Sequence, residues 1–132
     1  MAAVKSKNTT PEMSVRRLLF AQGYRYRLYA KTLPEKPDLV FPARRKAIFV
    51  HGCFWHGHRC SKGRLPKSNL DFWQAKITRN RQRDQENARA MKKLGWLVLV
   101  VWQCQLRHPL RLLTKMTHFL EKTSPFAAGQ TV

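Results

Sequence analysis

Residues 47–60 read AIFVHGCFWHGHRC, and this stretch decides how the rest of the chain is arranged. Its first four residues are all apolar, which predicts a short buried strand. The residues that follow hold three of the chain's five histidines, two of its three cysteines and two adjacent aromatic residues. A strand that ends in such a cluster places metal ligands, proton carriers and stacking surfaces at one edge of a sheet. We therefore expect the functional site at this edge.

The bulk composition limits the class of protein. A chain of 132 residues, 43% of them hydrophobic, predicts one folded domain. We expect a flexible basic arm at 1–9, a single domain at 10–122 and a loose tail at 123–132. No apolar run approaches the ~20 residues of a membrane span, and the first residues lack the apolar core of a signal peptide. These features predict a cytosolic protein with no membrane partner.

Charge is the strongest bulk signal. Lys and Arg number 26 against seven Asp and Glu, a formal net charge of +19. Such self-repulsion opposes compactness, so it indicates a polyanionic partner, with nucleic acid first. A merely solvated basic surface, as in ribosomal proteins, is the alternative interpretation. An odd number of cysteines argues against a disulfide framework and, with histidines nearby, favours zinc.

The sequence on either side of the central stretch predicts a mixed α/β fold. Thr10 can cap a helix that starts with Pro11 and Glu12 and ends at Gly23. Aromatic or apolar residues alternate with basic residues at 24–29, which predicts a strand with one solvent-exposed face. Residues 37–42 and 46–51 flank a basic turn and predict an antiparallel hairpin. This pairing brings Asp38, at the start of one strand, and His51, at the end of the other, to the same end of the sheet.

The second half of the chain predicts two helices around one strand. We expect a helix from about Leu70 to Leu94, ended by Gly95. Its central part is charged. This part is either a solvent-exposed face with ion pairs such as Arg81–Asp84 or a surface that lies along a nucleic-acid backbone. Residues 96–102 are apolar throughout, as in a strand covered on both faces, which implies a crossover to a parallel neighbour. A helix at 109–122 closes the domain.

Three constellations carry chemistry. Cys53, His58, Cys60 and Cys104 can close a tetrahedral zinc site, although by spacing alone His51 or His56 could replace His58, and unliganded buried cysteines are the plain alternative. Asp38 can hold Mg²⁺ while His51, helped by His56, takes a proton from water, the parts that phosphodiester hydrolysis needs. Asp38 could equally be a simple turn residue.

The third constellation is aromatic. Phe54 and Trp55 are consecutive in a loop, so they cannot both enter one core pocket. Trp73 lies in the first turns of the long predicted helix. Such rings can stack on bases or wedge between them. Covering the metal site is the structural alternative.

Five groups of residues form a larger pattern: Pro37-Asp38-x-Val40; Phe49-x-His51-Gly52-Cys53-Phe54-Trp55-His56-x-His58-x-Cys60; Phe72-Trp73-x-x-Lys76-Ile77 with Asn80 and Arg83-Asp84; Leu94-Gly95-Trp96; and Val101-Trp102-x-Cys104. Together they resemble the very short patch repair (Vsr) endonucleases over roughly residues 4–120. This resemblance implies a restriction-endonuclease-like α/β core, a mixed β-sheet flanked by helices with a structural zinc site, in which Phe49-Val50-His51 replaces the usual acidic-x-lysine element. It also implies an enzyme that nicks one strand 5′ to the thymine of a T:G mismatch left by deamination of 5-methylcytosine.

The resemblance implies a role for each matching residue. Asp38 and the main-chain carbonyl of Val50 would hold Mg²⁺, with His51, His56 and Glu12 as further catalytic residues. It selects His58 as the fourth zinc ligand. The implied DNA contacts are Met1, Phe54, Trp55, Trp73, Lys76 and Asn80.

The expected partner is double-stranded DNA with a T:G mismatch, bound by a monomer that is associated with the nucleoid and contacts other DNA repair proteins. Two alternatives stay open: a non-catalytic zinc-stapled basic DNA-binding module, and an endonuclease of the same fold with another substrate.

Overall fold

The computed structural model describes residues 10–28, 33, 37–55, 57, 58, 60 and 64–122. The predicted arm and tail therefore lie outside the described residues, as does His56. In chain order the elements are α1 (Thr10–Ala21), β1 (Leu39–Phe41), the 3₁₀ turn η1 (Pro42–Arg44), β2 (Lys46–His51), α2 (Leu70–Lys93), β3 (Leu97–Trp102), the 3₁₀ turn η3 (Gln103–Arg107) and α3 (Pro109–Glu121). None of the described helices is long and apolar enough to cross a membrane.

The sheet has three strands in the order β1-β2-β3. β1 pairs antiparallel with β2, with Leu39 opposite Ile48, and β2 pairs parallel with β3, with His51 opposite Trp102. The hairpin, the crossover through α2 and the mixed α/β fold class are thus confirmed. The hairpin turn is tight because Arg45 adopts a left-handed conformation after η1 (φ 52°).

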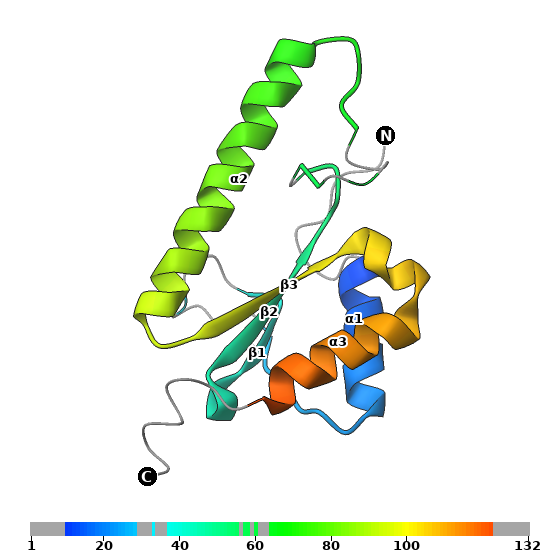
Figure 1. Ribbon diagram of the computed structural model, residues 1–132, viewed down its shortest axis with the longest axis vertical. Coiled ribbons are helices and arrows are strands. Elements are labelled where there is room, and N and C mark those ends of the chain that lie inside the picture. Colours follow the sequence, from blue (N-terminus) through cyan, green and yellow to red (C-terminus); the bar gives the residue numbers. More distant parts are fainter. Residues whose placement is uncertain are drawn as a thin grey trace.

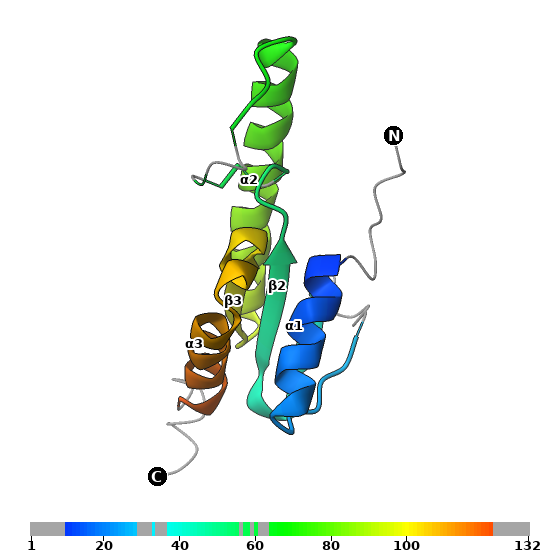
Figure 2. The same cartoon turned by 90° about the vertical axis from the view of Figure 1, so that its right-hand side faces the viewer.

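The core lies between one face of the sheet and the pair α1 and α3 (Figures 1 and 2). Alternate strand residues such as Leu39, Ile48 and Val101 point to this face. They meet Val15 and Leu19 of α1 together with the apolar side of α3. This alternation leaves Phe49 and His51 of β2 for the opposite face, where α2 packs.

α2 covers the second face only in part. Ile77 and Met91 are its buried residues, and Figure 1 shows its N-terminal part extending beyond the sheet. The helix ends where predicted, because Gly95 takes a positive φ of 85° after the cap Leu94.

One detail of the predicted sheet is wrong, and one is confirmed in part. Residues 24–28 form no regular strand: Arg27 makes a single bridge to Val40, because β1 is only three residues long and is followed by Pro42, which has no N–H to donate. β3 is packed on both faces as predicted, although only partly buried: Leu97 and Leu99 lie against the core, and Val98 and Val100 face α2. Of its residues only Val101 is fully buried.

A buried lysine joins the start of β2 to the end of α3. Lys46 is 2% exposed, and its Nζ donates to the carbonyl oxygens of Phe119, Leu120 and Lys122 at 2.6–2.9 Å. These carbonyls belong to the last turn of α3 and its cap, where the helix supplies no N–H partner. Lys46 thereby fixes α3 against the sheet.

Candidate active site

Asp38 lies in a bend just before β1, beside the end of β2. Its Oδ2 accepts a hydrogen bond from the Val50 N–H at 2.6 Å, and its carboxyl shares a hydrogen bond with Glu12. Burial, with this hydrogen bond and the charge of Glu12, raises the pKa of Asp38 to about 8. Two carboxyl groups that share a proton in this way are a donor set suited to a divalent cation, which can replace the proton.

Glu12 reaches this position from the first turn of α1 and is 2% exposed. Its Oε2 lies 3.2 Å from Nη2 of Arg16, one helical turn later, and Arg16 is itself 7% exposed. The guanidinium partly offsets the repulsion between the two carboxyl groups, since its charge lowers the pKa of Asp38. α1 thus delivers an acid and its counter-ion to the end of the sheet.

His51 is the last residue of β2 and is 7% exposed. Its Nδ1 lies 3.9 Å from Oδ2 of Asp84 on α2, and its ring meets Trp102 edge-on with centroids 5.3 Å apart. The separation of 3.9 Å exceeds a hydrogen bond but lets the carboxylate stabilise a protonated imidazole. α2 therefore supplies an acidic neighbour to the candidate base.

Asp38 and His51 lie at the same end of the sheet, because Asp38 binds the N–H of the residue that precedes His51. Their side-chain neighbours differ. Asp38 meets Glu12 of α1, whereas His51 lies next to Asp84 of α2. The end of β2 between them is where a phosphate and a water would have to sit for both side chains to act.

A cluster of possible metal ligands follows β2. One ligand atom from each of Cys53, His58, Cys60 and Cys104 lies within 4.8 Å of the others, and Cys104 Sγ is 3.5 Å from Nδ1 of His58. Two thiolates on a tetrahedral zinc stand roughly 3.8 Å apart, so these residues fit such an ion. Burial raises the pKa of Cys53 to about 11, with the neighbouring thiols adding to the effect. Without a metal, that thiol stays protonated.

The candidate DNA-contacting residues also come together. The rings of Phe54, Trp55 and Trp73 pack edge to face with centroids 5.1–5.8 Å apart. Nδ2 of Asn80 donates to the Trp55 carbonyl at 2.8 Å, and Nζ of Lys76 lies 5.5 Å from the centre of the Trp55 ring. Met1 is outside the described residues.

A glycine lets this loop lie directly on α2. Gly57 has a φ of 63°, and a Cβ there would stand 2.6 Å from Cγ2 of Ile77. The loop with Phe54 and Trp55 is thus held against α2 by both close packing and the Asn80 hydrogen bond.

Sequence reasoning gave no role in the site to two residues, Arg16 and Asp84. Arg16 stands four residues after Glu12 on one helix, a spacing that could have indicated the ion pair. The charge pattern places Asp84 on an exposed face with Arg81. The Arg83-Asp84 motif of the family resemblance was a signal for Asp84, but no pattern shows that the crossover helix turns this side chain toward β2.

The fold and the edge residues define an α/β protein of the restriction-endonuclease-like class. The family model "DNA mismatch endonuclease Vsr" matches residues 1–62. The chain is 54% identical to the type II nicking enzyme V.XorIIP of Xanthomonas oryzae pv. oryzae over 92% of this chain and 89% of that protein. It is 49% identical to the type II nicking enzyme V.NmeAIP of Neisseria meningitidis over 82% of this chain and 77% of that protein. It is 40% identical to the DNA mismatch endonuclease Vsr of Escherichia coli over 81% of this chain and 69% of that protein.

The three relatives each match between 81% and 92% of this chain. The chain belongs to the Vsr family of DNA mismatch endonucleases. It is therefore an enzyme that hydrolyses phosphodiester bonds in DNA.

Proposed function

We propose that this endonuclease nicks one DNA strand 5′ to the thymine of a T:G mismatch, in a reaction that depends on Mg²⁺. The observation that carries the proposal is a pair of carboxyl groups at the end of β2 that presents His51. Asp38 accepts the Val50 N–H there, and the buried Glu12 shares a hydrogen bond with Asp38. Family membership supports mismatched DNA as the substrate.

Asp38, Glu12 and the Val50 carbonyl would hold the Mg²⁺, which when bound supplies positive charge at the scissile phosphate. His51 accepts the proton of the attacking water, and the Asp84 carboxylate stabilises the imidazolium that forms. His56 would act as the second catalytic histidine.

Other residues bind and present the DNA. Phe54, Trp55 and Trp73 wedge into the duplex beside the mismatch, where their stacking offsets the cost of unstacking a base step. Lys76 and Asn80, one helical turn apart on α2, contact the mismatched pair, and Met1 contacts DNA from the arm. Cys53, His58, Cys60 and Cys104 would hold a Zn²⁺ ion, which would fix the loop with Phe54 and Trp55 to η3. The protein acts as a monomer on DNA in the cytoplasm.

The test uses a labelled duplex with a single T:G pair, with a matched T:A duplex beside it. Wild-type protein should nick the T:G duplex in Mg²⁺ and leave it intact in Mg²⁺-free buffer. Asp38→Ala and His51→Ala should bind the duplex yet nick it at least about a hundredfold more slowly.

Asp71→Ala and His118→Ala serve as matched controls, since both residues are exposed and away from the end of β2. They should nick at the wild-type rate. Binding without cleavage of any mismatch by the wild type would contradict the proposal and leave a DNA-binding module. Cleavage of other duplexes but not of the T:G duplex would indicate an endonuclease with a different substrate.

A further inference from the structure

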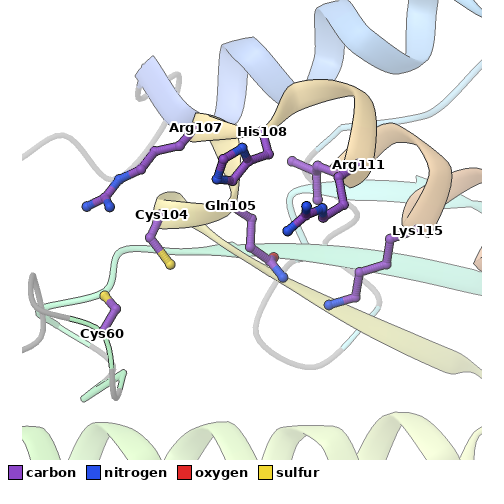
Figure 3. A pocket seen from close by; sticks show the side chains of 8 residues that line it. Cys60, Cys104, Gln105, Arg107, His108, Arg111 and Lys115 are labelled. Atoms are coloured by element: carbon purple, nitrogen blue, oxygen red, sulfur yellow. The ribbon is translucent and has the colours of Figure 1, made fainter.

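A cavity of about 360 Å³ opens beside the Cys/His cluster, between η3 and the first turns of α3. Figure 3 shows Gln105, Arg111 and Lys115 extending toward this space, with Arg107 nearer to Cys104. The oxygen Oε1 of Gln105 accepts the Trp102 N–H at 2.8 Å, so the amide NH₂ is the group that Gln105 can offer the cavity.

The basic residues of this cavity have no evident structural purpose. No carboxylate is among the described residues that line it, and the sequence has no Asp or Glu between Glu86 and Glu121. Arg111 and Lys115 stand four residues apart on one face of α3, where like charges repel and mildly destabilise a helix. Both side chains are exposed, and a chain that gathers positive charge at such a cost has an anion as its natural partner.

The cavity lies at the same end of the sheet as the candidate active site. Trp102 pairs in register with His51, η3 follows Trp102 directly, and Cys60 and Cys104 form the border of the cavity. A duplex bound with one phosphate at the end of β2 would continue past this border. The anion within reach is therefore another phosphate of the same DNA.

We propose that Arg107, Arg111 and Lys115, with the Gln105 amide, form a clamp for a DNA backbone phosphate away from the scissile bond. The inference rests on the proposed function in that the ligand is its DNA substrate. Phosphate binding of this kind supplies affinity and register without reading sequence. The clamp therefore strengthens binding to matched and mismatched duplexes alike.

The experiment measures the dissociation constant for a T:G duplex and a matched duplex as a function of salt, in Mg²⁺-free buffer. Arg111→Gln/Lys115→Gln should bind both duplexes about tenfold more weakly. It should also lower the slope of log K against log salt by about 0.9 for each phosphate that the variant no longer neutralises. The preference for the mismatch should not change.

Lys92→Gln/Lys93→Gln is the matched control. It removes the same charge at the end of α2, which lies at the opposite end of β3 from η3. This control should keep a slope close to that of the wild type. If the double cavity variant does not fold, the exposed single variants Arg107→Gln and Lys115→Gln each replace it and should show a smaller decrease in slope.

Two results would overturn the clamp. One is a slope change equal to that of the Lys92/Lys93 control. The other is loss of bound zinc and of thermal stability with an unchanged slope, which would mean that the basic residues only balance the charge of the Cys/His cluster. Binding is measured without Mg²⁺, so it does not depend on nicking. If the cavity variant lowers the slope but the wild type never nicks a T:G duplex, the proposed function is overturned and the clamp is retained.

Discussion

The Asp38 side chain is placed where two requirements conflict. Its position beside Glu12 and its burial suit a bound cation, but in the metal-free protein the same surroundings disfavour a negative charge. The Val50 N–H and Arg16 relieve this only in part. The residue is thus held in a state that a divalent ion would stabilise.

The conflict predicts how the stability of the Mg²⁺-free protein depends on pH. The pKa of Asp38 is about 8 in the folded protein and near 4 in the unfolded chain. Its contribution is fully present below about pH 4 and is lost as the pH rises through 8, because only the folded state holds the proton. Asp38→Asn should therefore raise the free energy of unfolding by about 1–3 kcal/mol at pH 9 and by less at pH 5.

Chemical denaturation at the two pH values measures this difference, and Mg²⁺ at pH 9 should stabilise the wild type but not Asp38→Asn. The metal-free measurements use Mg²⁺-free buffer and not a chelator, because a chelator would also remove a metal bound to the Cys/His cluster. An equal effect of the substitution at both pH values would contradict the assignment of the raised pKa to Asp38.

At the scale of elements, α2 links two parts of the site. Its N-terminal half carries Trp73, Lys76 and Asn80 next to the aromatic loop, and its later turns carry Asp84 next to His51. One rigid helix thus sets the position of the DNA wedge relative to the candidate base.

This arrangement predicts that Asp84→Asn slows nicking without weakening DNA binding. Loss of the negative charge leaves the His51 imidazolium unsupported as it forms, so we expect a rate about 10- to 100-fold lower. Single-turnover nicking of the T:G duplex measures the rate, and a gel-shift titration measures binding. Asp71→Asn, an exposed change on the same helix, should nick normally. Equal rates for the two variants would show that Asp84 does not act on His51.

At the scale of the whole molecule, the Cys/His cluster lies between the loop after β2 and η3. A metal bound there would tie Cys53, His58 and Cys60 to Cys104, which follows a different strand. His58 also stacks on Trp102, with ring centroids 4.1 Å apart. The described sheet has only three strands, and a bound metal would hold together the segments that follow β2 and β3.

We therefore predict that His58→Ala loses about one equivalent of zinc and lowers the midpoint of thermal unfolding by about 10 °C or more. Elemental analysis and thermal denaturation measure the two quantities. The matched change His118→Ala, at an exposed position on α3, should alter neither. Cys104→Ala should behave like His58→Ala, and full stability of both variants without metal would contradict a structural zinc site.

The sequence by itself determined the helices, the hairpin and the crossover, because caps, glycine stops and apolar periodicity act within a few residues of each other. It also determined that Asp38 and His51 share one end of the sheet, since antiparallel pairing leaves no other arrangement. The composition of residues 53–60 with Cys104 was enough to indicate the ligand cluster.

The tertiary structure alone decided which side chains face each other across elements. Asp84 next to His51 depends on the rotation of α2 about its axis, and Lys46 under the end of α3 depends on how that helix lies on the sheet. The bridge at Arg27 in place of a strand depends on how much of β1 is left to pair. Such contacts join residues far apart in the chain, and no local pattern encodes them, because they follow from how whole elements pack.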